Sequence, residues 1–338
     1  MKKLSLLLIG LLLVPTLFLT SCDRGDDPDD TTATTPAFTL MKSYMVQNGL
    51  DVNNILINTD SQKFVVAAPG DIADVPGFLS TYYIMDLRNQ AAFDGAHLDG
   101  ANRVDFANIL TVAATTTKPI LMVCYSGQTA CYATALLRMY GYPSTRALKW
   151  GMSGWNSGTA ASWNNNIGTT ANGHASWSTD NVPPTNMVFD NPIISSSLTD
   201  GEAILKQRVR AVVESTNGFG DATVSNGDVL ANPGNYFINN YFNDTDYAGF
   251  GHIDGAYRIN PLLLGDNTHL GLNPDATVVT YCYTGQTSAV LTATLRVLGY
   301  DAKSLLFGMN GMYNDNPAWT SNKWSASVSK DYPVISDN

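Results

Sequence analysis

Two stretches of this chain repeat one strand–turn–helix pattern, and the repeat is the strongest constraint on its fold. Residues 119–142 read PILMVCYSGQTACYATALLRMYGY, and residues 277–300 read TVVTYCYTGQTSAVLTATLRVLGY. In each stretch an apolar run ends in a cysteine, Cys124 or Cys282, and a polar turn leads into a helical pattern closed by glycine. A cysteine that faces the start of a helix can form a reactive thiolate, because free N–H groups and the helix dipole stabilise a negative sulfur.

The repeat extends beyond the two cysteines. FDGAHLDGA near His97 matches FGHIDGA near His252, and LKWGMSGW at 148–155 matches LFGMNGM at 306–312. The spacing is nearly constant, 155 residues between the histidines and 158 between the cysteines. A fixed period of this kind indicates one domain present twice. We place domain 1 at residues 39–196 and domain 2 at residues 197–338.

Short β-like runs alternate with helical patterns in both copies, which predicts an α/β fold with a parallel sheet in each domain. Strands are expected near residues 64–67, 82–86, 120–124, 145–148, 236–239, 278–282 and 304–307. Helices are expected near residues 40–48, 128–140, 151–156, 198–214 and 286–298. The segment 156–192, rich in Asn, Ser, Thr and Gly, is expected to be a surface extension that leads into the interdomain linker.

The N-terminus has the features of a targeting segment. Lys2 and Lys3 precede an apolar run, residues 4–19, and the sequence LTSC ending at Cys22 resembles the bacterial lipobox. This resemblance implies a lipoprotein signal peptide at 1–21, lipidation of Cys22, and anchoring of an extracytoplasmic protein to a bacterial membrane, on the periplasmic side or the cell surface. An ordinary signal peptide or an uncleaved anchor is the alternative. Residues 22–38 are expected to form a disordered acidic tether.

The formal net charge of −10, with no basic run outside Lys2 and Lys3, argues against nucleic acid as a partner. With Cys22 assigned to a lipid, three cysteines remain. Cys124 and Cys131 are expected about 10 Å apart along one helix, too far for a disulfide. We therefore expect free thiols. Cys131, replaced by Ala289 in the second copy, is expected to be a small core residue, with a resolving thiol as the alternative.

Four motifs in order resemble the rhodanese-like family. They are Asp-x-Arg at 86–88, the turn around each histidine, the Cys-x-x-Gly-x-Thr loop and Gly-Met-x-Gly near the end of each copy. The resemblance implies two tandem rhodanese-like domains, each a mainly parallel sheet flanked by helices. It also implies a sulfurtransferase that moves sulfane sulfur through a cysteine persulfide, with a small sulfur donor and a thiol acceptor as partners. Neither a cofactor nor a metal is implied.

On this resemblance Cys124 and Cys282 are the nucleophiles. The loops that cradle the substrate anion are Tyr125, Ser126, Gly127, Gln128 and Thr129 in copy one, and Tyr283, Thr284, Gly285, Gln286 and Thr287 in copy two. Related phosphatases use a longer Cys-x5-Arg loop, whereas the sixth residue here is Ala130 or Ser288, which argues against phosphoryl transfer.

Neither loop contains Lys or Arg, although thiosulfate is a dianion. The neutral loops more closely resemble those of mercaptopyruvate sulfurtransferases or persulfide-handling rhodaneses. Basic residues elsewhere could supply charge: Arg103, Arg138, Lys149, Arg258 and Arg296.

Other motif residues are expected to support the site. Asp86 and Arg88 are expected to brace the first loop, and the second copy replaces them with Asn240 and Phe242. His97 and His252 are expected to be structural, with a catalytic base as the alternative. Trp150 is expected near the pocket mouth, as a core residue or a substrate contact.

Three hypotheses follow from the sequence. The first is a sulfurtransferase that uses one or both cysteines. The second is a binding module on the same fold, motivated by the neutral loops and the lost Asp–Arg pair. The third is a sulfur-relay partner that receives sulfur from another protein.

Overall fold

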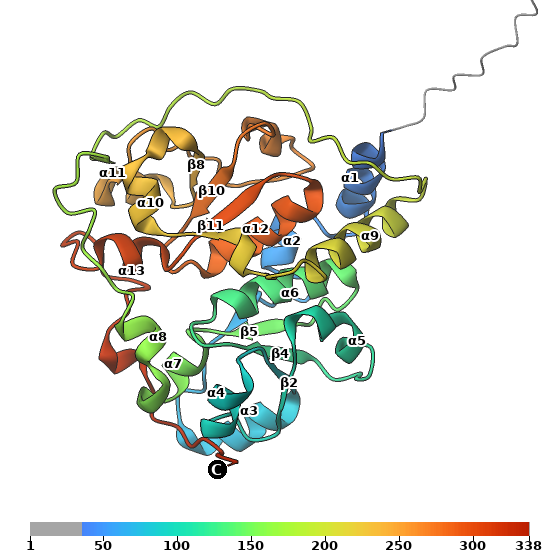
Figure 1. Cartoon of the computed structure of the whole chain (residues 1–338), viewed down its shortest axis with the longest axis vertical. Coiled ribbons are helices and arrows are strands. Elements are labelled where there is room, and N and C mark those ends of the chain that lie inside the picture. The colour runs from blue at the N-terminus through green and yellow to red at the C-terminus, as the bar shows by residue number, and fades with distance from the viewer. Residues whose placement is uncertain (1–35, 338) are drawn as a thin grey trace, which may run out of the picture. The chain divides into compact units, whose positions relative to one another are not determined.

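Two parallel sheets carry the fold (Figure 1). The computed structural model describes residues 36–337. The first sheet has the order β1-β5-β4-β2-β3, with β1 (Val65–Val66), β5 (Arg146–Leu148), β4 (Ile120–Val123), β2 (Tyr83–Asp86) and β3 (Ala101–Arg103). The second has the order β7-β11-β10-β8, with β7 (Thr223–Val224), β11 (Ala302–Leu305), β10 (Val278–Tyr281) and β8 (Phe237–Asn240). The α/β fold with two mainly parallel sheets is confirmed.

Helices surround both sheets. They are α1 (Ala37–Gln47), α2 (Val52–Leu56), α3 (Val75–Thr81), α4 (Gln90–Gly95), α5 (Ile109–Ala113), α6 (Gln128–Tyr140), α7 (Gly151–Trp155), α8 (Ala161–Asn164), α9 (Gly201–Val213), α10 (Asn226–Ala231), α11 (Asp244–Phe250), α12 (Gln286–Leu298) and α13 (Gly308–Tyr313). Helices α6 and α12 pack against each other, and nearly every residue of both is buried. A helix that is apolar on all sides belongs in a core. The two cysteine loops, which precede these helices, therefore meet at the centre of the molecule.

The strands before the cysteines, β4 and β10, are central in their sheets and buried along their whole length. Such a continuous apolar run is what a sheet covered on both faces requires. Asp86 pairs with Val123 and Asn240 pairs with Tyr281 at the carboxyl ends of these sheets. The equivalence of Asp86 and Asn240, inferred from the sequence, holds in the structure.

Each copy also extends a segment onto the other. Gly168 donates to the carbonyl of Asn310 at 3.0 Å, and β6 (Trp177–Ser178) pairs antiparallel with β9 (His252–Ile253). In the opposite direction, Ile335 and His97 exchange backbone hydrogen bonds of 2.8 and 2.9 Å. The expectation that 156–192 is only a surface extension is therefore wrong in part. The segment has few apolar residues, so its composition does not reveal that it packs on the second copy.

Element boundaries differ little from the expected ones. The strand expected at 304–307 lies at 302–305, because Phe307 adopts a left-handed conformation (φ 60°) that ends the strand. Helix α9 is capped by Asp200, which accepts from the N–H of Ala203 at 2.8 Å.

The predicted signal peptide and Cys22 lie outside the described residues. Within residues 36–337, no helix has the length and apolar character to cross a membrane.

Candidate active site

Cys124 stands directly after β4, and its sulfur accepts hydrogen bonds at the start of α6. The backbone N–H of Gly127 donates to Cys124 Sγ at 3.1 Å, and that of Ala130 donates at 3.3 Å. Gly127 has the left-handed conformation (φ 88°) that turns the chain into the helix. The predicted first loop is thus a cradle of backbone donors that can stabilise a negative sulfur.

The cradle does not make Cys124 an acidic thiol. Complete burial raises the pKa of Cys124 above its ordinary value, although the N–H groups of Ala130, Ser126 and Gly127 act in the opposite direction. Desolvation of the charged form therefore outweighs the hydrogen bonds. Burial therefore opposes the stabilisation of the thiolate that the backbone donors provide.

Cys282 has a related but different environment. The backbone N–H of Ser288 donates to Cys282 Sγ at 3.3 Å, and Cys282 Sγ lies 3.6 Å from the Ser288 hydroxyl. That hydroxyl also lies 2.8 Å from the hydroxyl of Ser304. The first copy has Ala130 in place of Ser288, so the side-chain hydroxyl near the sulfur is particular to the second copy.

The Gly-Met-x-Gly motif holds each loop in place. The N–H of Met152 donates to the carbonyl of Cys124 at 2.9 Å, and that of Met309 donates to the carbonyl of Cys282 at 3.0 Å. In both copies the residue before the motif, Trp150 or Phe307, is left-handed. The short helices α7 and α13 therefore begin by satisfying the loop carbonyls.

A pocket of about 400 Å³ opens over the first loop and includes Cys124. Its walls are aromatic and neutral polar and come from both copies, with Phe106 from copy one and Phe219 and Phe307 from copy two. Trp150 is not among its lining residues and instead packs in a buried aromatic cluster. This position favours the interpretation of Trp150 as a core residue.

Trp163 belongs to the same cluster, and the sequence analysis missed it. It is fully buried, stacks on Trp324 at 5.3 Å, and donates from its indole N–H to the carbonyl of Ser126 at 3.0 Å. A large aromatic residue in a polar segment was the available signal. Trp163 holds the first loop through its hydrogen bond to Ser126.

A second pocket, of about 410 Å³, lies against the second loop. Each copy contributes five residues to it: Tyr283, Thr284, Gln286, Thr287 and Asn322 from copy two, and Lys63, Phe64, Val65, Ala67 and Lys149 from copy one. Cys282 is not among the lining residues, whereas Cys124 lines the first pocket, and both cysteines are buried. The structure therefore brings the predicted loop residues together in both copies, and only Cys124 borders the pocket over its own loop.

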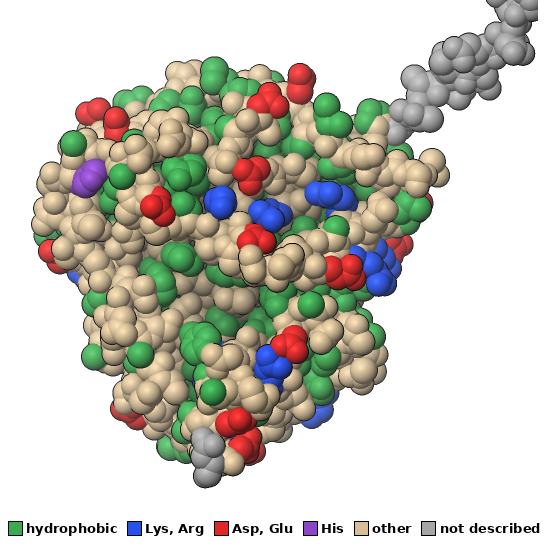
Figure 2. All heavy atoms as spheres, in the orientation of Figure 1, with side chains coloured by type: hydrophobic (Ala, Val, Ile, Leu, Met, Phe, Trp, Pro, Cys, Tyr) green, Lys and Arg blue, Asp and Glu red, His purple; other side chains and the backbone are tan. Residues whose placement is uncertain are grey.

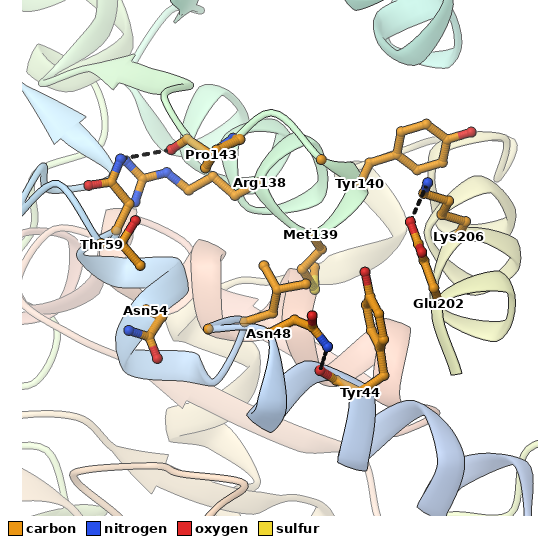
Figure 3. A pocket seen from close by; sticks show the side chains of 14 residues that line it. Tyr44, Asn48, Asn54, Thr59, Arg138, Met139, Tyr140, Pro143, Glu202 and Lys206 are labelled. Carbon is orange, nitrogen blue, oxygen red and sulfur yellow. Dashed lines mark hydrogen bonds and ion pairs between the residues drawn. The ribbon is translucent and has the colours of Figure 1, made fainter. Parts of the chain in front are cut away.

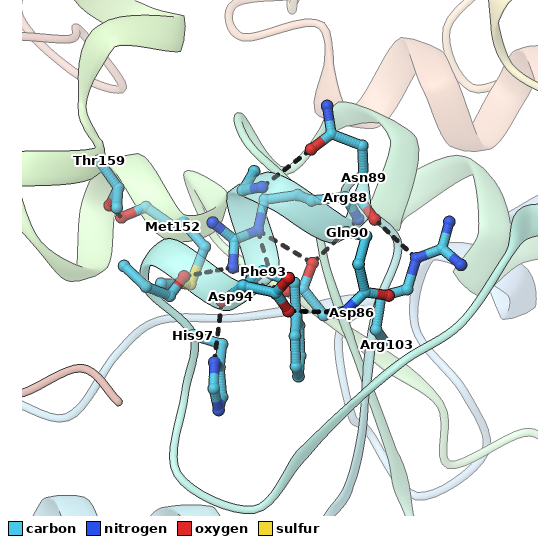
Figure 4. A network of polar contacts seen from close by, with 12 residues as sticks. Asp86, Arg88, Asn89, Gln90, Phe93, Asp94, His97, Arg103, Met152 and Thr159 are labelled. Atoms are coloured by element: carbon cyan, nitrogen blue, oxygen red, sulfur yellow. Dashed lines mark hydrogen bonds and ion pairs between the residues drawn. The ribbon is translucent and has the colours of Figure 1, made fainter. Parts of the chain in front are cut away.

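Asp86 and Arg88 form a buried ion pair of 2.6 Å beside the first loop (Figure 4). Arg88 also donates to the carbonyl of Ala96 at 2.6 Å, and its guanidinium lies 5.8 Å from the ring centre of Tyr125. The pair therefore places the Arg88 guanidinium against Tyr125 of the first loop.

The second copy braces its loop by stacking. Phe242 takes the place of Arg88 and stacks on Tyr283 with ring centres 4.6 Å apart. Asn240 takes the place of Asp86 and donates to the hydroxyl of Tyr281 at 2.7 Å. A neutral packing contact thus replaces the charged one.

Both histidines are held by their own turns. His97 stacks on Phe93 at 4.0 Å, and its Nδ1 lies 2.9 Å from the Phe93 carbonyl. His252 stacks on Tyr247 at 3.8 Å, and burial lowers its pKa. Neither lines the pockets over the cysteine loops. This geometry favours structural roles.

The remaining predicted residues are the three cysteines and the five basic residues considered as sources of charge. Cys124, Cys131 and Cys282 are free, as expected, and all three are buried. Of the five basic residues considered as sources of charge, only Lys149 lines a pocket over a loop. The other four are bound elsewhere: Arg103 to Asp105, Arg138 to the carbonyls of Ile55 and Thr145, Arg258 to Asp244, and Arg296 to the carbonyl of Ala302.

A further cavity of about 370 Å³ lies among α1, α2, α9 and the end of α6 (Figure 3). It contains no residue of either cysteine loop. Of its charged side chains, Lys206 and Glu202 pair with each other at 2.6 Å, and Arg138 donates to the carbonyls of Ile55 and Thr145. This cavity shares no lining residue with the two pockets over the cysteine loops.

Charge on the surface is sparse. On the face drawn in Figure 2, Lys and Arg side chains are interspersed with Asp and Glu. Among residues 36–337, no group of three or more His, Cys, Asp or Glu side chains is arranged to hold a metal ion.

The fold and the site define a duplicated α/β protein with a cysteine loop after the central strand of each copy. The model of the rhodanese-like domain matches residues 73–158 and 242–315. The thiosulfate sulfurtransferase GlpE of Pseudomonas fluorescens is 31% identical over 74 residues, which are 21% of this chain and 68% of that protein. The chain belongs to the rhodanese-like family and carries its domain in tandem.

Solved structures give distant matches. A thiosulfate sulfurtransferase from Pseudomonas aeruginosa is 15% identical with a TM-score of 0.28, covering 86% of this chain and 50% of that one. The 3-mercaptopyruvate sulfotransferase SseA from Escherichia coli is 13% identical with a TM-score of 0.26, covering 77% of this chain and 100% of that one.

Proposed function

We propose that this protein transfers sulfane sulfur through a persulfide on Cys124, with Cys282 as a second carrier. One observation carries the proposal: Cys124 Sγ accepts two backbone N–H groups, at 3.1 and 3.3 Å, and lines a pocket of about 400 Å³. Those donors can stabilise a thiolate and equally the negative outer sulfur of a persulfide. Membership of the rhodanese-like family supports this chemistry.

The transfer has two balanced steps. The Cys124 thiolate attacks the sulfane sulfur of the donor, an S–S bond to cysteine forms, and the donor's bond to that sulfur breaks with its electron pair. From thiosulfate the leaving group is sulfite. An acceptor thiolate then attacks the outer sulfur, and the Cys124 thiolate leaves. Because burial raises the pKa of Cys124, the resting thiol first gives its proton to solvent or to a basic group of the donor.

The place of action is part of the proposal. A lipid on Cys22 would hold domains at 39–196 and 197–338 outside the cytoplasm, on a bacterial membrane. The basic n-region, the apolar run and LTSC support it. Labelling with a radioactive fatty acid in a bacterial host, lost in Cys22→Ala, tests it.

The second candidate is a binding or sulfur-relay module with weak catalysis. The position of Cys282, which does not line the pocket over its own loop, favours this candidate for the second copy. Such a module would receive sulfur from a protein rather than from a small molecule. Rapid labelling of both thiols without turnover of any small donor would support it.

The test is intact-mass spectrometry after incubation with thiosulfate, 3-mercaptopyruvate or glutathione persulfide. We expect the mass of one or two sulfur atoms to be added, and peptide mapping to place sulfur on Cys124. Cys131→Ser is the matched control and should keep the full gain, whereas Cys124→Ser should lose it at that site. A wild-type protein that gains no sulfur from any donor would contradict the proposal.

A further inference from the structure

The pockets over the two cysteine loops differ in charge. The pocket that contains Cys124 has aromatic and neutral polar walls without Lys or Arg. The pocket against Tyr283–Thr287 is lined by two lysines, Lys63 and Lys149. Both belong to copy one, so the charge reaches the second loop from the other half of the molecule.

Sheet register identifies what replaces these lysines on the opposite side. Ala147 pairs with Val65, and Ser304 pairs with Thr223, so Ala147 and Ser304 are equivalent. Lys149 and Leu306 each follow two residues later and are therefore equivalent as well. Leu306 lines the first pocket as Lys149 lines the second. A Lys-to-Leu difference accordingly accounts for much of the contrast between the pockets.

Neither lysine has an acidic partner. No ion pair within residues 36–337 involves Lys63 or Lys149. The Lys149 ammonium donates to the side-chain carbonyl of Asn322 at 3.2 Å and lies 5.4 Å from the ring centre of Trp150. Burial lowers the pKa of Lys149, and the nearby positive charge of Lys63 lowers it further. Two cations that repel each other in one cavity of an acidic protein are stabilised by an anion between them.

The second loop adds groups that bind anions. Its threonines, Thr284 and Thr287, line the same pocket, and the 13-residue helix α12 begins there at Gln286. Hydroxyl donors and a helix N-terminus both favour negative charge. The lysines supply the net charge that the neutral loop lacks.

We propose that Lys63 and Lys149 of copy one form an anion site over the loop of copy two, which selects small dianionic sulfur oxyanions such as thiosulfate. The identity of the ligand rests on the function proposed above, whereas the existence of an anion site does not. The first pocket, which has leucine in place of Lys149, lacks this selection. The lysines of copy one thereby supply the positive charge that the loop of copy two lacks.

Binding is tested with thiosulfate by isothermal titration calorimetry on the full mature chain carrying Cys124→Ser and Cys282→Ser, in which no sulfur can be transferred. We expect one saturable site whose affinity falls with added salt. Lys149→Leu should weaken binding by about tenfold or more, and Lys63→Gln by a smaller factor because Lys63 is exposed. Lys149→Arg should keep most of the affinity, which excludes misfolding as the cause of the loss.

Lys118→Leu is the matched control, since it removes the same charge from a residue outside this pocket. It should bind thiosulfate as the parent does. Absence of binding in the parent, or equal affinity in Lys149→Leu and Lys118→Leu, would overturn the anion site. Leu306→Lys should create a second binding site in the first pocket.

Sulfur uptake separates this inference from the proposed function. With both cysteines present, Lys149→Leu should reduce the uptake of sulfur from thiosulfate at Cys282 and leave uptake at Cys124 unchanged. Lysine-dependent binding without any uptake would keep the anion site and remove the sulfurtransferase. If uptake at Cys282 were unchanged in Lys149→Leu, the sulfurtransferase would stand and the role of the anion site would be overturned.

Discussion

Gln128 and Gln286 reach across the molecule in opposite directions, each from the first position of its helix into the other copy. The side-chain oxygen of Gln128 accepts the backbone N–H of Phe307 at 2.8 Å, and the side-chain amide of Gln286 donates to the carbonyl of Ser126 at 3.1 Å. A Cβ on Gly127 or Gly285 would lie 2.2 Å from the opposite glutamine, so each loop glycine makes room for it. The two cysteine loops are therefore built as one unit.

Gln128→Ala should accordingly affect the second copy, although the substitution lies in the first. It leaves the buried N–H of Phe307 without a partner, which should lower the free energy of unfolding by about 1–3 kcal/mol. The loss should also loosen the turn on which the Cys282 loop rests. Urea denaturation measures the first effect, and peptide-resolved labelling of Cys282 with iodoacetamide measures the second.

Gln90→Ala is the control for this experiment. The Gln90 side chain is exposed and bonds only to Asp94 at 2.6 Å, so its loss should be close to neutral. Labelling of Cys282 that is unchanged in Gln128→Ala would show that the loops are not coupled.

Asp86→Asn should be among the most destabilising substitutions near the first loop. It leaves the Arg88 guanidinium, 2% exposed, without its counter-charge, which costs about 3–5 kcal/mol. The double variant Asp86→Asn, Arg88→Phe reproduces the pair found in copy two, with no buried charge, and should recover a large part of that loss. Denaturant unfolding of the single and double variants decides the matter. A double variant less stable than Asp86→Asn alone would show that the ion pair is not the source of the cost.

The parts of this site that follow from local sequence could be predicted, and the parts made by docking could not. The strand before Cys124, the turn at Gly127 and the helix after it are consecutive in the sequence, so local hydrophobic and turn patterns predict all three. Because the sequence repeats, the same three elements could be predicted for the second copy. Lys149 reaches the second loop only because the two copies pack together, and Trp163 contacts Phe307 and Trp324 of copy two for the same reason. No periodicity in the sequence records these contacts.

The burial of Cys124 also depends on residues that are distant in sequence. The hydrogen-bond donors around Cys124 are adjacent in sequence and could be anticipated. Residues that line the pocket together with Cys124, such as Phe219 and Phe307 from copy two, are distant in sequence. The sign of the Cys124 pKa shift was therefore not accessible from the motif alone.

Labelling of Cys124 should shift toward higher pH in the folded protein. Burial raises the pKa of Cys124 above its ordinary 9.0, so the thiolate that reacts with iodoacetamide should appear only as the pH rises past that value. The unfolded thiol ionises first, so this group should also destabilise the fold as the pH rises above the unfolded pKa. Rate–pH profiles of Cys124 in native protein and in denaturant provide the comparison. A native profile at lower pH than the denatured one would contradict the dominance of burial.

Gly151→Ala should disrupt the contact that holds the first loop against α7. Gly151 has a φ of 62°, and a Cβ there would lie 2.4 Å from the carbonyl oxygen of Cys124.

Gly100 offers a matched control, because its φ of 73° is as unfavourable but nothing lies within 4 Å of its Cβ position. Gly100→Ala should cost about 1–2 kcal/mol for the left-handed conformation alone. Gly151→Ala should cost clearly more, because the clash is with backbone that cannot rotate away. It should also reduce sulfur uptake at Cys124, since the loop carbonyl must move. Denaturant unfolding and peptide-mapped sulfur uptake of the two variants, measured together, test both effects, and equal losses in the two would rule out the packing of α7 on the loop as the cause.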